Sequence, residues 1–362
     1  MPSSGRTEPK RIAHLFGAGA TQAEADYLGA RPVNLLMRDN PTGDGLSTRI
    51  LQRSGVNGRS FMVDRGVDVE KLISLLAASG AARHATLAQE MRQLYFDEVI
   101  RGLAEARVIA TPQLAIALLE MHRKTQFQRN VEKLIGILTT NHDGLLQIAF
   151  QEVLGAVNLG FPFASSEFTP AMSSAVPPLL QLHGSFTWTF GVPIEIRRLR
   201  PSSRYHPDTV WLPPAILKES KTYPFNRIAS VAYALLVDAC DVLRVVGSSL
   251  AQNDWNVLSL VFNAQRHREA VGRSTFKIEL IMPHQHGVDI QGDCSYLSEL
   301  TPIGFLTEGR FEAYKEEPGT QDPGMNNVFA YWLKEKVTHH YRRREFGTGE
   351  LKGAMATISG EA

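Results

Sequence analysis

The feature that most constrains the fold is a set of short apolar segments that end abruptly in polar or small residues. Leu134 to Leu138 runs into Thr139-Thr140-Asn141-His142-Asp143, and Leu179 to Leu182 runs into His183 and Gly184. Open α/β sheets assemble their sites from groups that follow the carboxyl ends of parallel strands. The pattern therefore predicts an α/β protein with its functional groups along one edge of a sheet.

Two further apolar segments end in glycine turns that lead directly into helices. Arg11 to Phe16 leads into Gly17-Ala18-Gly19-Ala20-Thr21, and Asp241 to Val246 leads into Gly247-Ser248-Ser249-Leu250. Such a turn lets a pyrophosphate approach the N–H groups of a helix N-terminus. A tight turn that needs small residues explains the first turn equally well, and Gln22 stands where the dehydrogenase fingerprint has its third glycine.

The remaining segments complete an alternation of strands and helices. We expect a second strand over Val33 to Met37, a helix over Ile228 to Val237, a helix capped by Asn253 or Asp254, and a last strand over Phe276 to Met282. This alternation is typical of a doubly wound, Rossmann-like parallel sheet.

We divide the chain into four parts. A flexible N-terminus (1–10) precedes a catalytic domain (11–310), which contains a helical insertion at about 65–130. A C-terminal amphipathic helix region (311–346) and a flexible tail (347–362) follow.

Composition excludes several classes of function. A formal net charge of +1 over 362 residues gives no general attraction to nucleic acid or membranes. Two cysteines, Cys240 and Cys294, cannot build a disulfide framework or a four-cysteine zinc ribbon. His284 and His286 with Cys294 match no standard zinc spacing, so we predict no metal. We expect a cytoplasmic protein without a membrane span, and no direct contact with nucleic acid.

Taken singly, the polar residues have both functional and structural interpretations. Asn141 and Asp143 offer an amide and a carboxylate to a ligand, but they are also favoured residues at a helix start. A neutral His183 can accept a proton from a hydroxyl or a water, although a lone histidine is more often structural. The segment from Gly247 to Ala251 is close to the nucleophile elbow of serine hydrolases, with Ser249 as nucleophile, but Ala251 breaks that motif.

The order of these motifs resembles the sirtuin family, whose members cleave NAD at the nicotinamide–ribose bond. The resemblance covers roughly residues 11–283 and rests on the short motifs quoted above. It implies that His183 is the catalytic base, that Asn141 orients the ribose or water, and that Asp143 meets the nicotinamide carboxamide. The other residues that it implies for NAD binding are Gly17, Ala18, Gly19, Thr21, Gly247, Ser248, Ser249 and Asp254.

Two departures narrow the resemblance. The zinc ribbon of classical protein deacylases is missing, and Gln22 to Asp26 replaces their Pro-Asp-Phe-Arg-type segment. The branch that shares these departures consists largely of NAD hydrolases of bacterial antiviral defence, which often act as oligomers beside a sensor such as a HerA-type ATPase. The resemblance therefore implies a latent, homo-oligomeric NAD glycohydrolase. A protein deacylase, an ADP-ribosyltransferase and a non-catalytic NAD or ADP-ribose sensor remain alternatives.

Overall fold

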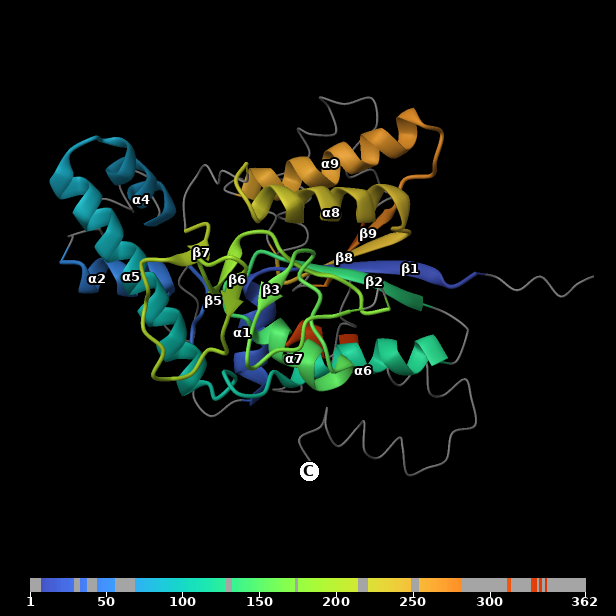
Figure 1. Cartoon of the computed structure of the whole chain (residues 1–362), viewed down its shortest axis with the longest axis horizontal. Coiled ribbons are helices and arrows are strands. Elements are labelled where there is room, and N and C mark those ends of the chain that lie inside the picture. Colours follow the sequence, from blue (N-terminus) through green and yellow to red (C-terminus); the bar gives the residue numbers. More distant parts are fainter. Residues whose placement is uncertain are drawn as a thin grey trace, which may run out of the picture.

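A parallel sheet lies at the centre of the molecule. The computed structural model describes residues 8–28, 33–37, 44–55, 69–127, 132–172, 175–213, 221–248, 254–281, 311–313, 327–330, 332–333 and 336. Within these ranges, six parallel strands pair in the order β10-β9-β8-β1-β2-β4 (Figure 1). Their bounds are β1 (Lys10–Phe16), β2 (Glu132–Thr139), β4 (Leu179–Gln181), β8 (Val242–Val246), β9 (Lys277–Ile281) and β10 (Phe311–Ala313).

The strand order contains a reversal beside β1. The chain proceeds from β1 to β2 and β4, then returns to the opposite side of β1 with β8 and continues outward to β9 and β10. Ligands of open α/β sheets bind at such a reversal, beyond the carboxyl ends of the strands. The prediction of a doubly wound, Rossmann-like α/β fold is confirmed, and the reversal lies between β1 and β8.

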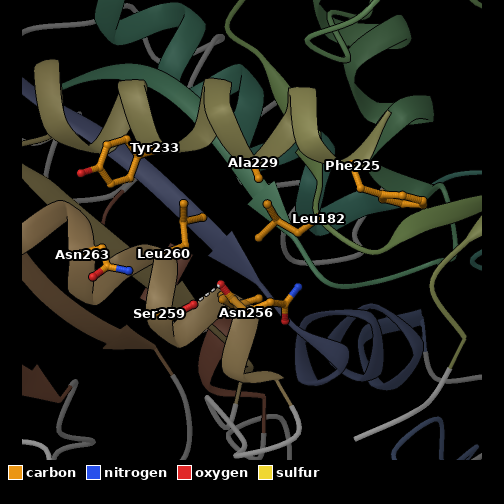
Figure 2. Close-up of a pocket in the computed structure, with 9 residues that line it drawn as sticks. Leu182, Phe225, Ala229, Tyr233, Asn256, Ser259, Leu260 and Asn263 are labelled. Atoms are coloured by element: carbon orange, nitrogen blue, oxygen red, sulfur yellow. Dashed lines mark hydrogen bonds between the residues drawn. The ribbon is translucent and has the colours of Figure 1, made fainter. Parts of the chain in front are cut away.

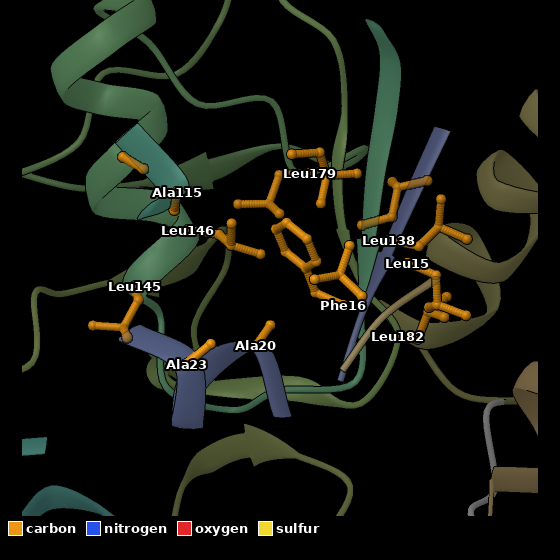
Figure 3. Close-up of a cluster of buried hydrophobic side chains, with 14 of the residues drawn as sticks. Leu15, Phe16, Ala20, Ala23, Ala115, Leu138, Leu145, Leu146, Leu179 and Leu182 are labelled. Carbon is orange, nitrogen blue, oxygen red and sulfur yellow. The ribbon is translucent and has the colours of Figure 1, made fainter. Parts of the chain in front are cut away.

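Helices cover both faces of this sheet. In Figure 1, α8 (Phe225–Asp238) and α9 (Trp255–Ala270) lie on one face, while α1 (Ala18–Leu28), α6 (Gln113–Phe127) and α7 (Leu145–Leu154) lie on the other. The second group packs its apolar side chains against the carboxyl end of β1, as Figure 3 shows for Phe16, Ala20, Leu145 and Leu146. An apolar core therefore lies directly behind the turn that follows this strand.

A smaller sheet and three helices lie beyond the carboxyl ends of the main sheet (Figure 1). The small sheet has the order β3-β6-β5-β7, and sequence analysis did not predict it. Its strands are β3 (Phe163–Ala164), β5 (Gly184–Thr189), β6 (Ile194–Ile196) and β7 (Thr209–Trp211), and the helices are α2 (Leu46–Arg53), α4 (Val69–Ala78) and α5 (Ala82–Glu105). Helices α4, α5 and α6 fall within the predicted insertion, but α6 packs on β2 as part of the main fold.

The strand predicted over Val33 to Met37 is wrong. This segment pairs with no strand among the described residues, and the Gln22 side chain binds its backbone instead. Gln22 Nε2 donates to the Val33 carbonyl at 2.7 Å, and Gln22 Oε1 accepts from the Leu35 N–H at 2.6 Å. A buried side-chain amide has thus taken the place of a neighbouring strand in satisfying these backbone groups.

The described part of the C-terminal helix is internal. Val328, Phe329, Trp332 and Leu333 are all buried, so their apolar stripe belongs to the core. Trp332 lies under the guanidinium of the buried Arg244, 5.3 Å from its ring centre. As a separate finding, none of the helices in the described ranges is long and apolar enough to cross a membrane.

Arg244 is the centre of a buried ionic network. It donates to both carboxylate oxygens of Glu132, at 2.7 and 2.5 Å, and to Glu279 at 2.7 Å. Burial opposes the charge on Glu132, but its hydrogen bonds to Arg244 outweigh that effect and lower its pKa to about 2. The guanidinium of Arg244 on β8 therefore connects the carboxylates of Glu132 on β2 and Glu279 on β9, and each buried charge is stabilised by its partner.

Candidate active site

The predicted motifs follow four neighbouring strands. In the order β8, β1, β2 and β4, the strands lead into the turns that begin at Gly247, Gly17, Thr140 and Leu182. The turns are joined by backbone hydrogen bonds from Gly17 N–H to the Val246 carbonyl, from Thr140 N–H to the Phe16 carbonyl and from Leu182 N–H to the Thr139 carbonyl. The fold thus brings the sequence-predicted residues together beyond the carboxyl ends of these four strands, which include the two strands at the reversal of strand order.

The two glycine turns pack directly against each other. Gly19 N–H donates to the Gly247 carbonyl at 2.7 Å, and a Cβ on Gly19 would lie 2.7 Å from that oxygen. Gly247 has a φ of +58°, and a Cβ there would lie 2.3 Å from the nitrogen of Ala20. The glycines are therefore required by the contact between the turns, and their presence does not by itself indicate a nucleotide.

Gly247→Ala is expected to lower the free energy of unfolding by about 2–5 kcal/mol, the sum of left-handed backbone strain and overpacking against α1. Gly272→Ala is the matched control, because Gly272 has a φ of +72° but nothing lies within 4 Å of its added Cβ. Urea unfolding of both variants separates the two contributions. Equal losses would show that the contact between the turns contributes nothing.

A chain of hydrogen bonds links Asn141 to Asp143 through Thr21. Asn141 Nδ2 donates to the Gly17 carbonyl and to Thr21 Oγ1, both at 2.9 Å, and the Thr21 hydroxyl donates to Asp143 Oδ2 at 2.5 Å. Both amide hydrogens of Asn141 are thereby engaged within the protein. Its carboxamide oxygen is consequently the atom suited to accept a hydrogen bond from a ligand hydroxyl or a water.

Asp143 has a structural role in addition to any role toward a ligand. Its Oδ1 accepts from the N–H of Leu145, the first residue of α7, at 2.9 Å, although the N-cap residue itself is Gly144. Burial raises the pKa of Asp143, while the hydrogen bonds from Thr21 and Leu145 act in the opposite direction. Each carboxylate oxygen has a second lone pair, so an amide donor can still bind there.

A second buried carboxyl group, that of Glu24, lies on α1, one helical turn after Thr21. Glu24 accepts hydrogen bonds from the backbone N–H groups of Leu114 and Ala115, at 3.0 and 2.6 Å, at the beginning of α6. The pKa of Glu24 is raised to about 7: burial is the largest cause, the two backbone hydrogen bonds act in the opposite direction, and the charge of Asp143 adds to the effect of burial. Glu24 was not among the predicted site residues, because an acidic residue within a helix gives no signal of burial.

Glu24→Gln is expected to flatten part of the pH dependence of stability. The folded-state pKa of Glu24 lies above its ordinary value of 4.5, so its contribution is fully present below pH 4.5 and is lost as pH rises toward 7. Across that window the variant should gain up to about 3 kcal/mol relative to the wild type. Urea unfolding at several pH values measures this gain, with the exposed Glu195→Gln as control. A constant difference between Glu24→Gln and wild type would contradict the assignment.

His183 is buried at the end of β4, beside two oxygen atoms from the start of α9. Its Nε2 lies 3.4 Å from Asn256 Oδ1 and 3.9 Å from Asp254 Oδ1, and its side chain is 2% exposed. Both neighbours are hydrogen-bond acceptors, so Nε2 is the ring nitrogen that faces them as a donor, and Nδ1 is the acceptor of the neutral ring. Asp254 is the N-cap residue of α9, and its side chain makes no cap hydrogen bond to that helix.

A hollow of about 250 Å³ adjoins His183 between α8 and α9 (Figure 2). Leu182, which precedes His183, and Asn256, which contacts it, both line this hollow. All of its lining residues are uncharged; they are Leu182, Phe225, Ala229, Tyr233, Asn256, Val257, Ser259, Leu260 and Asn263. Such a lining suits an uncharged, partly apolar group rather than a phosphate.

Some predicted residues lie outside the described ranges. These include Ser249, Asn253, His284, His286 and Cys294. In the part of the chain that the structure does describe, no group of three or more His, Cys, Asp or Glu side chains is arranged to hold a metal ion.

The fold and this site define a class: a Rossmann-like α/β protein with a histidine–carboxylate pair among the polar groups beyond the carboxyl ends of its parallel strands. Comparison with protein-family models and with curated proteins finds no match to the chain.

Proposed function

We propose that this protein hydrolyses NAD to nicotinamide and ADP-ribose. The observation that carries the proposal is the convergence of the four motifs at one sheet edge, with His183 and Asp254 beside them. Each motif has a structural explanation on its own, but four polar or glycine-rich turns on adjacent strands form the kind of edge at which α/β proteins bind ligands. The resemblance to sirtuins supplies the identity of the ligand.

The proposed reaction breaks the bond between C1′ of the ribose and the nitrogen of nicotinamide. Nicotinamide leaves with the bonding electron pair, and a water oxygen forms the new bond to C1′. His183 accepts the proton that the water loses, and the carboxylate of Asp254, 3.9 Å away, stabilises the resulting imidazolium. The products are ADP-ribose, nicotinamide and one proton, which His183 returns to solvent.

Two other side chains have roles that follow from their hydrogen bonds. The carboxamide oxygen of Asn141 accepts a hydrogen bond from the attacking water or a ribose hydroxyl, because its amide hydrogens are engaged by Gly17 and Thr21. The carboxylate of Asp143 accepts from the carboxamide of nicotinamide through its remaining lone pairs. Thr21 connects the two and holds their spacing.

Acceptor-free turnover tests this proposal. The purified chain is incubated with NAD alone, and nicotinamide and ADP-ribose are quantified by chromatography; equal amounts of both are expected. Dependence on an acyl-lysine peptide or a protein acceptor would indicate a deacylase or an ADP-ribosyltransferase instead. NAD binding without turnover would indicate a sensor or a latent enzyme that lacks its activating partner, and labelling of Ser249 by a fluorophosphonate with no effect on NAD would indicate a serine hydrolase.

From the resemblance we further propose a setting for this activity. The enzyme would be a homo-oligomer in the cytoplasm that stays latent until a partner, such as a HerA-type ATPase or another sensor, reports infection. Its activation would then deplete NAD as an antiviral response. Light scattering of the purified chain tests the oligomeric state directly.

A further inference from the structure

His142, the residue between Asn141 and Asp143, is held by three segments of the protein. Its backbone carbonyl accepts hydrogen bonds from the Ser185 hydroxyl and the Phe186 N–H, both at 2.9 Å. Its ring nitrogen Nε2 lies 3.1 Å from the carbonyl oxygen of Leu212, just beyond β7. The ring also stacks on Phe186 at 5.3 Å between ring centres.

These contacts determine which nitrogen of His142 carries the hydrogen. A carbonyl oxygen can only accept, so Nε2 must be the donor to Leu212. In the neutral ring Nδ1 is then an acceptor, and its neighbour at 3.2 Å is the hydroxyl of Tyr95, which must donate. The position of the His142 ring therefore depends on a hydroxyl from the middle of α5, within the helical insertion.

Tyr95 is itself firmly oriented. Its ring stacks on Trp211 with an interplanar angle of 2° and a centre-to-centre distance of 5.8 Å. One helical turn further along α5, the buried carboxylate of Glu98 binds Arg49 and Arg53 of α2 as well as Arg101. The hydroxyl is thus presented to His142 by a helix that is fixed at both of these points.

The segments that contact His142 also contact His183 or follow it directly in the chain. Leu212, whose carbonyl binds the His142 ring, also donates its N–H to the His183 carbonyl at 2.8 Å. In the chain itself, Ser185 and Phe186 closely follow His183 and bind the His142 carbonyl. The two imidazole rings lie 6.1 Å apart at an angle of 30°. His142 is therefore connected to His183 by two routes, through Leu212 and through the backbone that follows His183.

We propose that Tyr95 and His142 are positioning residues for His183, through which the helical insertion sets the geometry of the catalytic histidine. This inference rests on the proposed cleavage of NAD at His183. Loss of the Tyr95 hydroxyl removes the hydrogen bond to Nδ1 of His142 and with it the polar contact between this ring and α5. Since rate depends steeply on the placement of a catalytic group, turnover falls while the affinity for NAD is retained.

Tyr95→Phe tests the proposal, because it removes the hydroxyl and keeps the ring that stacks on Trp211. Tyr205→Phe is the matched control: Tyr205 lies in the same aromatic cluster, but its hydroxyl binds Gln89 rather than a histidine. In Tyr95→Phe we expect kcat for nicotinamide release to fall about ten- to a hundredfold with KM unchanged. Tyr205→Phe should retain both values, and an unchanged kcat in Tyr95→Phe would overturn the proposal.

Imidazole ¹⁵N spectra of the same proteins provide a second readout that does not require turnover. The wild type should show His142 with its hydrogen on Nε2, and Tyr95→Phe, but not Tyr205→Phe, should shift the signals of both His142 and His183. A wild type that cleaves no NAD but shows this coupling would reject the proposed function and retain the link from Tyr95 to His183. His183 signals that are identical in Tyr95→Phe and wild type would overturn the link itself.

Discussion

Replacement of His183 by alanine is expected to lower the rate of nicotinamide release from NAD by about 10²–10⁴-fold, the usual contribution of a general base. The variant loses the group that accepts the proton of the attacking water and the partner of the Asp254 carboxylate. NAD affinity should change little, because the predicted contacts to phosphate and nicotinamide come from other turns. Steady-state kinetics and NAD titration measure the two effects separately.

His206→Ala is the matched control for this variant. His206 also lies beside a carboxylate, with Nδ1 3.7 Å from Asp208, but it is exposed and belongs to the loop before β7. It should retain wild-type turnover. Urea unfolding confirms that His183→Ala is folded, which matters because the His183 side chain is buried. A folded His183→Ala protein with wild-type turnover would contradict the assignment of the base.

Arg244→Ala is expected to lower the free energy of unfolding by about 3–5 kcal/mol, because it leaves the buried carboxylate of Glu132 without its main partner. Loss of the guanidinium also removes the contact with Trp332, which helps to hold the C-terminal helix against the sheet. Urea unfolding monitored by circular dichroism measures the loss.

Arg11→Ala provides the comparison on the same sheet. Arg11 pairs with Asp241 at 2.8 Å, but its side chain is 43% exposed, against 2% for Arg244. An exposed pair of this kind contributes about 0–1 kcal/mol. If the two variants unfolded at the same urea concentration, the buried network would not hold the strands together as described.

Sequence analysis predicted the main sheet except for β10, because its other strands and its helices carry their own periodic signals. The continuous apolar run before Gly247 is β8, and the helix predicted over Ile228 to Val237 is α8, with small differences at the ends. Strand ends that lead into polar turns also predicted which residues meet at the sheet edge. These features depend on residues that are close together in the sequence.

The remaining features depend on partners that are distant in the sequence. Gln22 gave no indication that its amide would bind the segment after α1, and so a strand was predicted there. The first glycine turn was interpreted either as an approach for phosphate or as a tight turn that needs small residues, and neither interpretation predicted that Gly19 and Gly247 approach each other. Asp254 was predicted to contact NAD, and its position beside His183 emerged only when α9 was placed on the sheet.

Other parts of the site went unrecognised for a similar reason. His142 lies inside a motif that was singled out, but its importance depends on Tyr95, which a helical pattern alone does not distinguish from a core residue. The alternation of polar and apolar residues from Ser185 to Phe190 was the available signal for β5 and thus for the small sheet.

Release of nicotinamide from NAD, measured by chromatography without any acceptor for wild type and His183→Ala in parallel, tests the central claim most directly. The account predicts equal amounts of nicotinamide and ADP-ribose from the wild type and only background release from the folded variant. Equal release by both proteins would contradict it. So would a wild type that neither releases nicotinamide nor melts at a higher temperature when NAD is added.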